Sequence, residues 1–280
     1  MRDPAPELDL TAAWEWLQRA THGESLDEAV LRLTAVGDWQ AAVPVSTAAG
    51  ALLDSLAPVA AHRGRLAIAQ LGQSLDGRIA TESGHSHYVN GRESRVHLHR
   101  LRALVDAVVV GAGTAAADDP RLTVRHVSGR HPVRVILDPR GRVPAELQLL
   151  SDPAAPTLHL IGEGVTRPDA PAAHVTRLTL PLQDGGFAPA GVLDLLAERG
   201  LARVLVEGGG DTVSRFLEAG VLDRLHLLVA PLLIGSGRPG LTLAPIVTLA
   251  EAPRPATRAL PCGDDTLFDL ALRQPSTAAP

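Results

Sequence analysis

The sequence predicts an α/β protein in which helices cover both faces of a mostly parallel sheet. Short apolar runs, rich in β-branched residues and bounded by Gly, Pro or Asp, have the length of buried strands. Helical stretches separate several of these runs, and this alternation is typical of parallel sheets. The predicted strands are residues 65–70, 106–111, 132–138, 157–162, 203–208 and 224–231.

Three helices between these strands have recognisable ends. Asn90 and Glu93 are spaced to cap a helix that runs to about Leu104. A glycine directly after a helix suits its C-terminal cap, because glycine adopts the left-handed conformation without strain. On this basis, helices are predicted over residues 190–199 and 211–219, ending at Gly200 and Gly220.

Residues 1–63 read as a helical extension, unlike the main domain that follows over residues 64–273. All three tryptophans lie in the extension, and its apolar residues recur at helical spacing. The extension is either a lid over a substrate or partner, or a segment that packs on the main domain or on a second subunit. Its expected helices lie around Trp14, after a capping box at residues 25–28, and around Leu53, and residues 274–280 form a flexible tail.

Composition excludes several classes of function. The net charge of −5 over 280 residues provides no overall basic surface for nucleic acid. No apolar run approaches the ~18 residues of a membrane span, and the N-terminus lacks the apolar core of a signal peptide, so we expect a cytoplasmic protein. All 26 basic residues are arginines, which excludes a lysine base, a Schiff-base lysine and a Walker-A lysine. The single Cys262 excludes an internal disulfide and a cysteine-rich zinc site.

Two polar segments follow the first predicted strand. Asp76 and Gly77 form a turn signal in the segment SLDGRIA, and a plain turn is its simplest interpretation. The next loop, rich in Gly, Ser and His, holds Tyr88, whose ring is a candidate surface for stacking a flat ligand. His85 and His87 lack a nearby set of partner ligands, so we expect no metal site.

Arg102 lies beside the apolar stripe of its predicted helix, which Leu98, Leu101 and Val105 form. A guanidinium near a core face needs an anionic partner. That partner is either a carboxylate of the fold or an anionic ligand, and the sequence leaves both open.

The loop after the strand at 106–111 lies where open α/β sheets bind ligands, at the carboxyl end of a strand. Its backbone amides and the Thr114 hydroxyl can hold a phosphate. Asp118 and Asp119 suit acid–base or metal chemistry, and the alternative is that Asp119-Pro120 forms a turn and one aspartate caps a helix.

The segment 203–220 is the most informative of the chain. A buried strand ends at Glu207, and three consecutive glycines and a helix start follow it. Glycines let a backbone approach a ligand closely, and a helix N-terminus favours an anion. The segment therefore predicts a phosphate cradle, although it matches neither GxGxxG nor a Walker loop. Glu207 is well placed to accept hydrogen bonds from an amino-substituted ring.

The order of these motifs over about residues 65–272 resembles the pyrimidine reductase domain of riboflavin biosynthesis. The matching segments are SLDGRIA, SGHSHYVNG, RALVDAVVVGAGTAAADDPRLTVR, PVRVILDPRGRVP and VLVEGGGDTVSRFLEAGVLDRLHLLVAPLLIG. The resemblance implies a dihydrofolate-reductase-like, three-layer αβα fold with a twisted sheet, a homodimer, NADPH as cofactor, and the phosphorylated small molecule 5-amino-6-(5-phosphoribosylamino)uracil as substrate. The deaminase that many bacteria fuse to this domain needs a zinc signature that this sequence lacks, so we expect no deaminase activity.

The resemblance also implies individual roles. The substrate-binding residues are Ser86, Arg102, Leu122, Arg125 and Glu207. The cofactor-binding residues are Gly72, Ser74, Tyr88, Thr114, Asp118, Gly208, Gly209, Gly210, Asp211, Thr212 and Arg215, and Arg140 or Arg142 is expected to meet the 2′-phosphate.

The implied reaction adds hydride to C1 of the ring-opened ribose and yields a ribityl chain. Arg102 and Arg125 are expected to hold the substrate phosphate, and Glu207 to orient the pyrimidine or the sugar. Asp76, Asp118 or a bound water would supply the proton. Two alternatives are the same fold acting on dihydrofolate or a diaminopyrimidinone ribosyl phosphate, and a non-catalytic nucleotide-binding relative.

Overall fold

The computed structural model describes residues 7–24, 30–34 and 37–273. Contacts divide the chain into two units, with the boundary between Gly64 and Arg65. The predicted capping box at residues 25–28 and the predicted tail at 274–280 lie outside the described residues.

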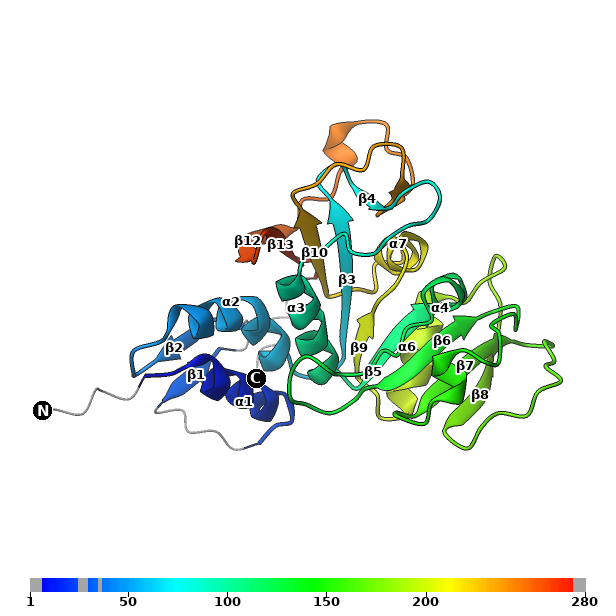
Figure 1. Cartoon of the computed structure of the whole chain (residues 1–280), viewed down its shortest axis with the longest axis horizontal. Coiled ribbons are helices and arrows are strands. Elements are labelled where there is room, and N and C mark those ends of the chain that lie inside the picture. Colours follow the sequence, from blue (N-terminus) through cyan, green and yellow to red (C-terminus); the bar gives the residue numbers. More distant parts are fainter. Residues whose placement is uncertain (1–6, 25–29, 35–36, 274–280) are drawn as a thin grey trace, which may run out of the picture. The chain divides into compact units, whose positions relative to one another are not determined.

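The larger unit contains one nine-stranded sheet in its described part, in the order β12-β13-β10-β3-β9-β5-β6-β7-β8. The strands from β10 to β8 pair in parallel, and all six strands predicted from the sequence are among them. Their bounds are β3 Leu66–Ser74, β5 Ala107–Gly111, β6 Val133–Asp138, β7 Thr157–Gly162, β8 Val175–Leu180, β9 Arg203–Val206 and β10 Arg224–Ala230. Figure 1 shows β3, β9, β5 and β6 side by side at the centre of this unit.

Both faces of the central parallel strands are buried. Val109 pairs with Val135 on one side and Val206 on the other, and all three belong to a core cluster that includes Val213 and Phe216 of helix α7. The residues that alternate with them, such as Val108 and Leu205, are also buried. Strands covered on both faces read as continuous apolar runs, which explains why the sequence revealed them.

The remaining elements of the larger unit are short or lie at its edges. The helices are α3 Arg92–Ala103, α4 Ala112–Asp118, α5 Gln148–Ser151, α6 Pro189–Glu198, α7 Gly210–Glu218 and the 3₁₀ turn η1 Leu249–Glu251. The other strands are β4 Arg78–Ala80, β11 Arg238–Pro239, β12 Ala256–Cys262 and β13 Asp265–Ala271. Gly200 and Gly220 have positive φ and follow α6 and α7, as predicted.

Strands β12 and β13 form an antiparallel hairpin beside β10, at an edge that the sequence did not predict. Buried Asp269 of β13 receives hydrogen bonds from the guanidinium groups of Arg224 and Arg258. Burial opposes ionisation of Asp269, but the contacts to His226 and the two arginines outweigh it and hold the pKa well below its usual range. A buried carboxylate matched by two cations therefore joins three strands.

Asp265, and not Asn90, organises the start of α3. One Asp265 carboxylate oxygen accepts hydrogen bonds from the Gly91 backbone N–H (2.9 Å) and the Ser94 hydroxyl (2.5 Å). The Asn90 amide donates to the Leu228 carbonyl and to Asp265. The predicted Asn90 cap is wrong, because a carboxylate distant in sequence takes that role.

Three buried histidines on and around α3 predict an acid-labile fold. His97 Nε2 lies 2.9 Å from His226 Nδ1, and burial lowers the pKa of both residues. Burial, followed by the charges of Arg102 and Arg125, lowers the pKa of His99 to about 3. The unfolded chain, with histidine pKa values near ~6.5, then binds protons that the folded protein does not.

Stability is therefore full above pH ~6.5 and falls as the pH drops below it, with each histidine contributing up to ~1.4 kcal/mol per pH unit. Urea unfolding across this range measures the slope. His97→Gln is expected to flatten it, whereas replacing the exposed His22 with Gln is the matched control and is expected to leave it unchanged. Equal stability on both sides of the histidine range would contradict the prediction.

The smaller unit contains α1 Leu10–Thr21 and α2 Thr47–Ala61, which confirm two of the helices predicted there. Between them lies an antiparallel hairpin of β1 Leu31–Leu33 and β2 Trp39–Ala41. The helical extension predicted over residues 1–63 thus also contains a hairpin, whose three-residue strands carry too short a pattern to predict. The indole of Trp39 donates to the Asp54 carboxylate at 2.8 Å and links the hairpin to α2.

Candidate active site

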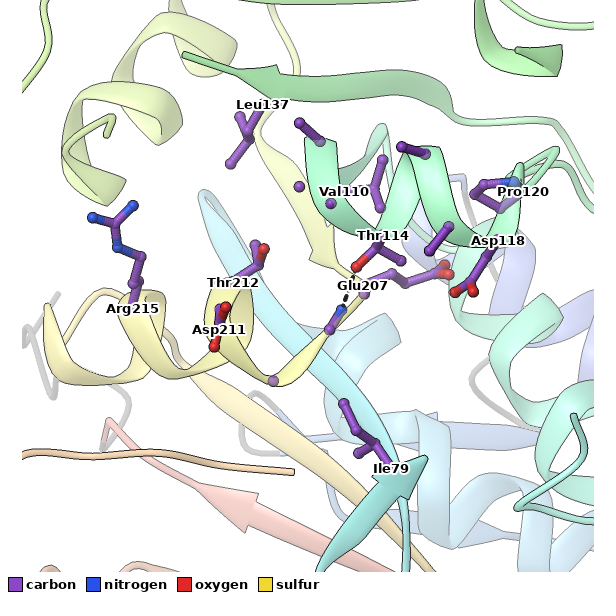
Figure 2. Close-up of a pocket in the computed structure, with 18 of the residues that line it drawn as sticks. Ile79, Val110, Thr114, Asp118, Pro120, Leu137, Glu207, Asp211, Thr212 and Arg215 are labelled. Carbon is purple, nitrogen blue, oxygen red and sulfur yellow. Dashed lines mark hydrogen bonds between the residues drawn. The ribbon is translucent and has the colours of Figure 1, made fainter. Parts of the chain in front are cut away.

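A cavity of about 1090 Å³ lies at the carboxyl ends of the parallel strands in the larger unit. The ends of β5, β6 and β9 and the beginnings of α4 and α7 line it, and Figure 2 shows Thr114, Glu207 and Thr212 around it. Ligands of open α/β sheets bind at this edge, where successive loops leave a crevice. The volume is large for a small-molecule site.

The glycine segment after β9 forms one wall of the cavity. Gly208 has a φ of +124°, a conformation that side chains resist, and α7 begins after Gly209 without any side-chain cap. The Gly209 N–H donates to the Thr114 hydroxyl at 2.8 Å, which joins the starts of α4 and α7 (Figure 2). The first turn of α7 therefore presents backbone N–H groups to the cavity, which suits an anion.

Arg102 and Glu207 form a buried ion pair on the cavity wall. Arg102 Nε and Nη2 each donate to a Glu207 carboxylate oxygen at 2.7 Å, and Nη1 donates to the Thr123 carbonyl at 3.1 Å. Their side chains are 7% and 8% exposed. The sequence left open whether the partner of Arg102 is a carboxylate of the fold or an anionic ligand, and in the structure it is a carboxylate of the fold. That carboxylate belongs to Glu207, the residue predicted to bind the substrate ring.

Four other arginines line the cavity: Arg140, Arg142, Arg215 and Arg238. Among the described residues, none of the four guanidinium groups has a carboxylate within ion-pair distance. The chain is acidic as a whole, so this concentration of unpaired cations marks the cavity as a site for an anionic ligand. The sequence predicted Arg140, Arg142 and Arg215 but missed Arg238, which lies in the Gly-rich turn GSGRPG.

Asp138 fixes the loop that carries Arg140 and Arg142. Its buried carboxylate accepts the backbone N–H groups of Arg142 (2.8 Å) and Val143 (2.9 Å) and contacts His159 Nε2 at 3.0 Å. Burial raises the pKa of Asp138, but the His159 contact and the two N–H groups outweigh it, so the net shift is downward. The carboxylate thus stays ionised and holds this loop.

The two aspartates after α4 have different surroundings. Asp118 is exposed and lines the cavity. Asp119 adopts the left-handed conformation at the end of α4, and its carboxylate accepts the Gln148 backbone N–H at 2.7 Å. The Asp119 carboxylate therefore anchors the start of α5, whereas the Asp118 carboxylate lies at the cavity. Leu122, with a φ of +53°, also lines the cavity.

Four predicted site residues are not among those that line the cavity: Ser74, Asp76, Tyr88 and Arg125. Asp76 accepts hydrogen bonds from the Ser74 hydroxyl and from the backbone of Gly235, and these contacts lower its pKa to about 2. Tyr88 is 73% exposed, and Arg95 lies 4.6 Å from its ring centre. Arg125 is exposed, and its Nη1 donates to the Thr123 hydroxyl at 2.9 Å.

The other predicted residues come together. The cavity wall includes Gly72, Ser86, Arg102, Thr114, Asp118, Leu122, Arg140, Glu207, Gly208, Gly209, Gly210, Asp211, Thr212 and Arg215. Residues from six separate segments of the sequence therefore meet at one site.

Two classes of site find no support in the described residues. Within residues 7–24, 30–34 and 37–273, His, Cys, Asp and Glu side chains form no group of three that could hold a metal ion. Over the same residues, no helix has both the length and the apolar character that crossing a bilayer requires.

In this parallel sheet, the strand ends, a glycine turn and several arginines surround one large cavity. This arrangement is typical of α/β proteins that bind their ligands at the carboxyl edge of the sheet. Within this class, the sequence profile of the RibD C-terminal domain matches residues 65–252, which are 188 of the 280 residues. The chain therefore belongs to the RibD C-terminal domain family.

Curated relatives include proteins of two lengths. The riboflavin biosynthesis protein RibD of Bacillus amyloliquefaciens is 39% identical over 181 residues, which cover 64% of this chain and 47% of that protein. The 2,5-diamino-6-ribosylamino-4(3H)-pyrimidinone 5′-phosphate reductase of Methanothermobacter thermautotrophicus is 34% identical over 221 residues, which cover 74% of this chain and 97% of that protein. The chain thus spans about half the length of the bacterial relatives.

Solved structures share the fold. A diaminohydroxyphosphoribosylaminopyrimidine deaminase/5-amino-6-(5-phosphoribosylamino)uracil reductase of Thermotoga maritima has a TM-score of 0.62 at 25% identity, over 82% of this chain and 64% of that chain. A crystal form of RibD from Acinetobacter baumannii has a TM-score of 0.62 at 27% identity, over 83% and 66%. These similarities confirm the predicted α/β class, the dihydrofolate-reductase-like fold of this family.

Proposed function

We propose that this chain is an NADPH-dependent reductase of a phosphorylated ribosylaminopyrimidine, with 5-amino-6-(5-phosphoribosylamino)uracil as its substrate. The observation that carries the proposal is the cavity at the strand ends, where an uncapped helix start and four unpaired arginines gather. Family membership supports reduction, and the cationic wall supports ligands that carry phosphate.

The glycine segment fits a dinucleotide. A Cβ atom at Gly210 would overlap the Gly240 carbonyl, and one at Gly111 would lie 2.5 Å from the Thr212 side-chain hydroxyl, so both glycines allow a closely packed wall. Such a wall brings N–H groups within reach of a diphosphate. Gly209, Gly210, Asp211 and Thr212 would hold the diphosphate, and Arg140, Arg142 and Arg215 provide the charge that favours a 2′-phosphate.

The residues of this chain contribute binding and charge to the reaction. NADPH, when bound, supplies hydride to the anomeric carbon of the opened sugar. The Arg102 guanidinium holds both Glu207 oxygens in fixed positions, and their remaining lone pairs can accept hydrogen bonds from the pyrimidine. Asp118 is the candidate proton donor, because its carboxyl group lines the cavity whereas Asp76 is fixed in a turn.

A second substrate is supported by one comparison. This chain spans nearly the whole of an archaeal relative that is named for the 2,5-diamino-6-ribosylamino-4(3H)-pyrimidinone 5′-phosphate. The two substrates share the ribosyl phosphate and differ on the ring, so they would present the same groups to the arginines. The diaminopyrimidinone is therefore the second candidate.

Loss of NADPH absorbance on mixing with each substrate tests the proposal. We expect turnover with the phosphoribosylaminouracil, slower or no turnover with the diaminopyrimidinone, and none with dihydrofolate, because dihydrofolate lacks the sugar phosphate. NADH in place of NADPH is expected to raise the cofactor KM. Turnover of dihydrofolate alone, or tight NADPH binding with no turnover of any of the three, would overturn the proposal.

A further inference from the structure

Arg167 does not line the cavity, but it holds the loop that carries two of the cavity's arginines. It belongs to the connection between β7 and β8. Its Nη1 donates to the backbone carbonyls of Gly141 (3.0 Å) and Val143 (2.6 Å). These two residues flank Arg142, so the Arg167 guanidinium fixes the backbone on both sides of a cavity-lining cation.

Arg167 shares this task with the buried carboxylate of Asp138. The Val143 N–H donates to Asp138, and the Val143 carbonyl accepts from Arg167. Arg167 Nη1 also lies 3.7 Å from the Asp138 carboxylate. Hydrogen bonds to charged groups are stronger than those between neutral groups. The backbone of the loop is therefore held by a matched anion and cation, one on each side.

The loop after β6 and the connection after β7 are also closely packed. The Gly162 N–H donates to the Pro139 carbonyl at 3.2 Å, and a Cβ atom at Gly162 would lie 2.6 Å from that oxygen. Gly141 has a φ of +63°, and a Cβ atom there would lie 2.7 Å from the Val165 side chain. A change at Arg167 is therefore transmitted to the loop that it contacts.

Asp169 fixes the Arg167 side chain. Arg167 Nε donates to the Asp169 carboxylate at 2.7 Å, and the Arg167 side chain is only 8% exposed. This hydrogen bond is the main cause that lowers the pKa of Asp169 to about 2, so the carboxylate is ionised at neutral pH. Arg177 of β8 binds the same residue, through its carboxylate at 2.7 Å and its backbone carbonyl at 2.9 Å.

We propose that Arg167 is a positioning residue for the choice of cofactor. It touches no ligand, and it acts by fixing the backbone from which the Arg140 and Arg142 guanidinium groups reach the cavity. The inference rests on the proposed function, which assigns those two arginines to the 2′-phosphate of NADPH. Because small displacements of a charged group cost much of its binding energy, loss of Arg167 weakens the preference for NADPH over NADH.

Steady-state kinetics of Arg167→Met with each cofactor test the inference. We expect the ratio of kcat/KM for NADPH to that for NADH to fall by about 10-fold, the effect of one charge-assisted hydrogen bond, mainly through a higher NADPH KM. Arg167→Lys is expected to recover part of the loss, because an ammonium group can still donate to one of the two carbonyls. The ratio is measured within one preparation, so a smaller folded fraction lowers both rates equally and leaves it unchanged.

Arg177→Met is the matched control. It removes the other arginine bound to Asp169, and among the described residues Arg177 has no hydrogen bond to the loop at 139–143. We expect its cofactor ratio to equal that of the wild type. An unchanged ratio in Arg167→Met, or an equal fall in Arg167→Met and Arg177→Met, would overturn the inference.

A binding measurement distinguishes this inference from the proposed function, because it needs no turnover. In calorimetric titrations, adenosine 2′,5′-bisphosphate is expected to bind about 10-fold more weakly to Arg167→Met than to the wild type or Arg177→Met. Adenosine 5′-monophosphate, which lacks the 2′-phosphate, is expected to bind equally to all three. If this pattern is seen but no pyrimidine is reduced, the role of Arg167 stands and the proposed function fails. Equal affinity of the bisphosphate for all three proteins would reject the role of Arg167, whatever the enzyme reduces.

Discussion

Arg102→Met and Glu207→Leu are each expected to destabilise the protein by about 3–5 kcal/mol, and combining them to recover most of that loss. Each single change leaves one charge in a site where both side chains are less than a tenth exposed. The Arg102 guanidinium then keeps only the Thr123 carbonyl, or the Glu207 carboxylate loses both of its 2.7 Å donors. Replacing both partners removes the buried charge and leaves apolar side chains of similar size.

Urea unfolding of the wild type, the two single variants and the double variant gives the coupling energy. Activity is expected to be lost in all three variants, because Glu207 lines the cavity. Only the double variant is therefore expected to regain stability without regaining activity. The matched control is Asp194→Asn, which breaks the 2.6 Å pair with Arg65 where both side chains are about 60% exposed, and it should cost less than about 1 kcal/mol. Additive losses in the double variant would show that the pair is not coupled.

The buried centre of the sheet was predictable because its strands carry their own signal. In β5, and in β9 after Arg203, every residue that faces either layer is apolar or glycine, so residues such as Val108 and Val206 form uninterrupted runs. The edges carry no such signal. β8 carries exposed Thr176 and Thr179 among half-buried residues such as Leu178. β13 places Asp269 in the core only because Arg224 and Arg258 approach from neighbouring strands.

The site was predictable where neighbours in sequence create it, and not where distant residues do. Three consecutive glycines before a helix indicate an anion site by local geometry alone. Arg102 and Glu207 are 105 positions apart in the sequence, and only the fold brings them together. The sequence pattern around Arg102 therefore could not decide whether its partner is a carboxylate of the fold or a ligand. Arg238 was missed because GSGRPG reads as a plain turn. Its position after the end of strand β10 was the available signal.

Gly210→Ala is expected to weaken NADPH binding by about 100-fold, the size of effect that a displacement near 1 Å produces in a catalytic site. The added methyl group would meet the backbone of Pro239 and Gly240, which have no flexible side-chain atoms to move aside. Either α7 must shift, or the β11 segment must leave its hydrogen bond to the Gly77 carbonyl. Both movements displace the N–H groups that face the cavity.

Gly191→Ala is the matched control, because a Cβ atom at Gly191 meets nothing within 4 Å and the residue lies in α6. It is expected to leave NADPH affinity unchanged and to stabilise the helix by up to about 1 kcal/mol. Fluorescence titration with NADPH compares the two variants with the wild type, and urea unfolding shows whether Gly210→Ala remains folded. A folded Gly210→Ala protein that binds NADPH as tightly as the wild type would place the cofactor away from α7, since its first turn cannot accept the methyl group without moving.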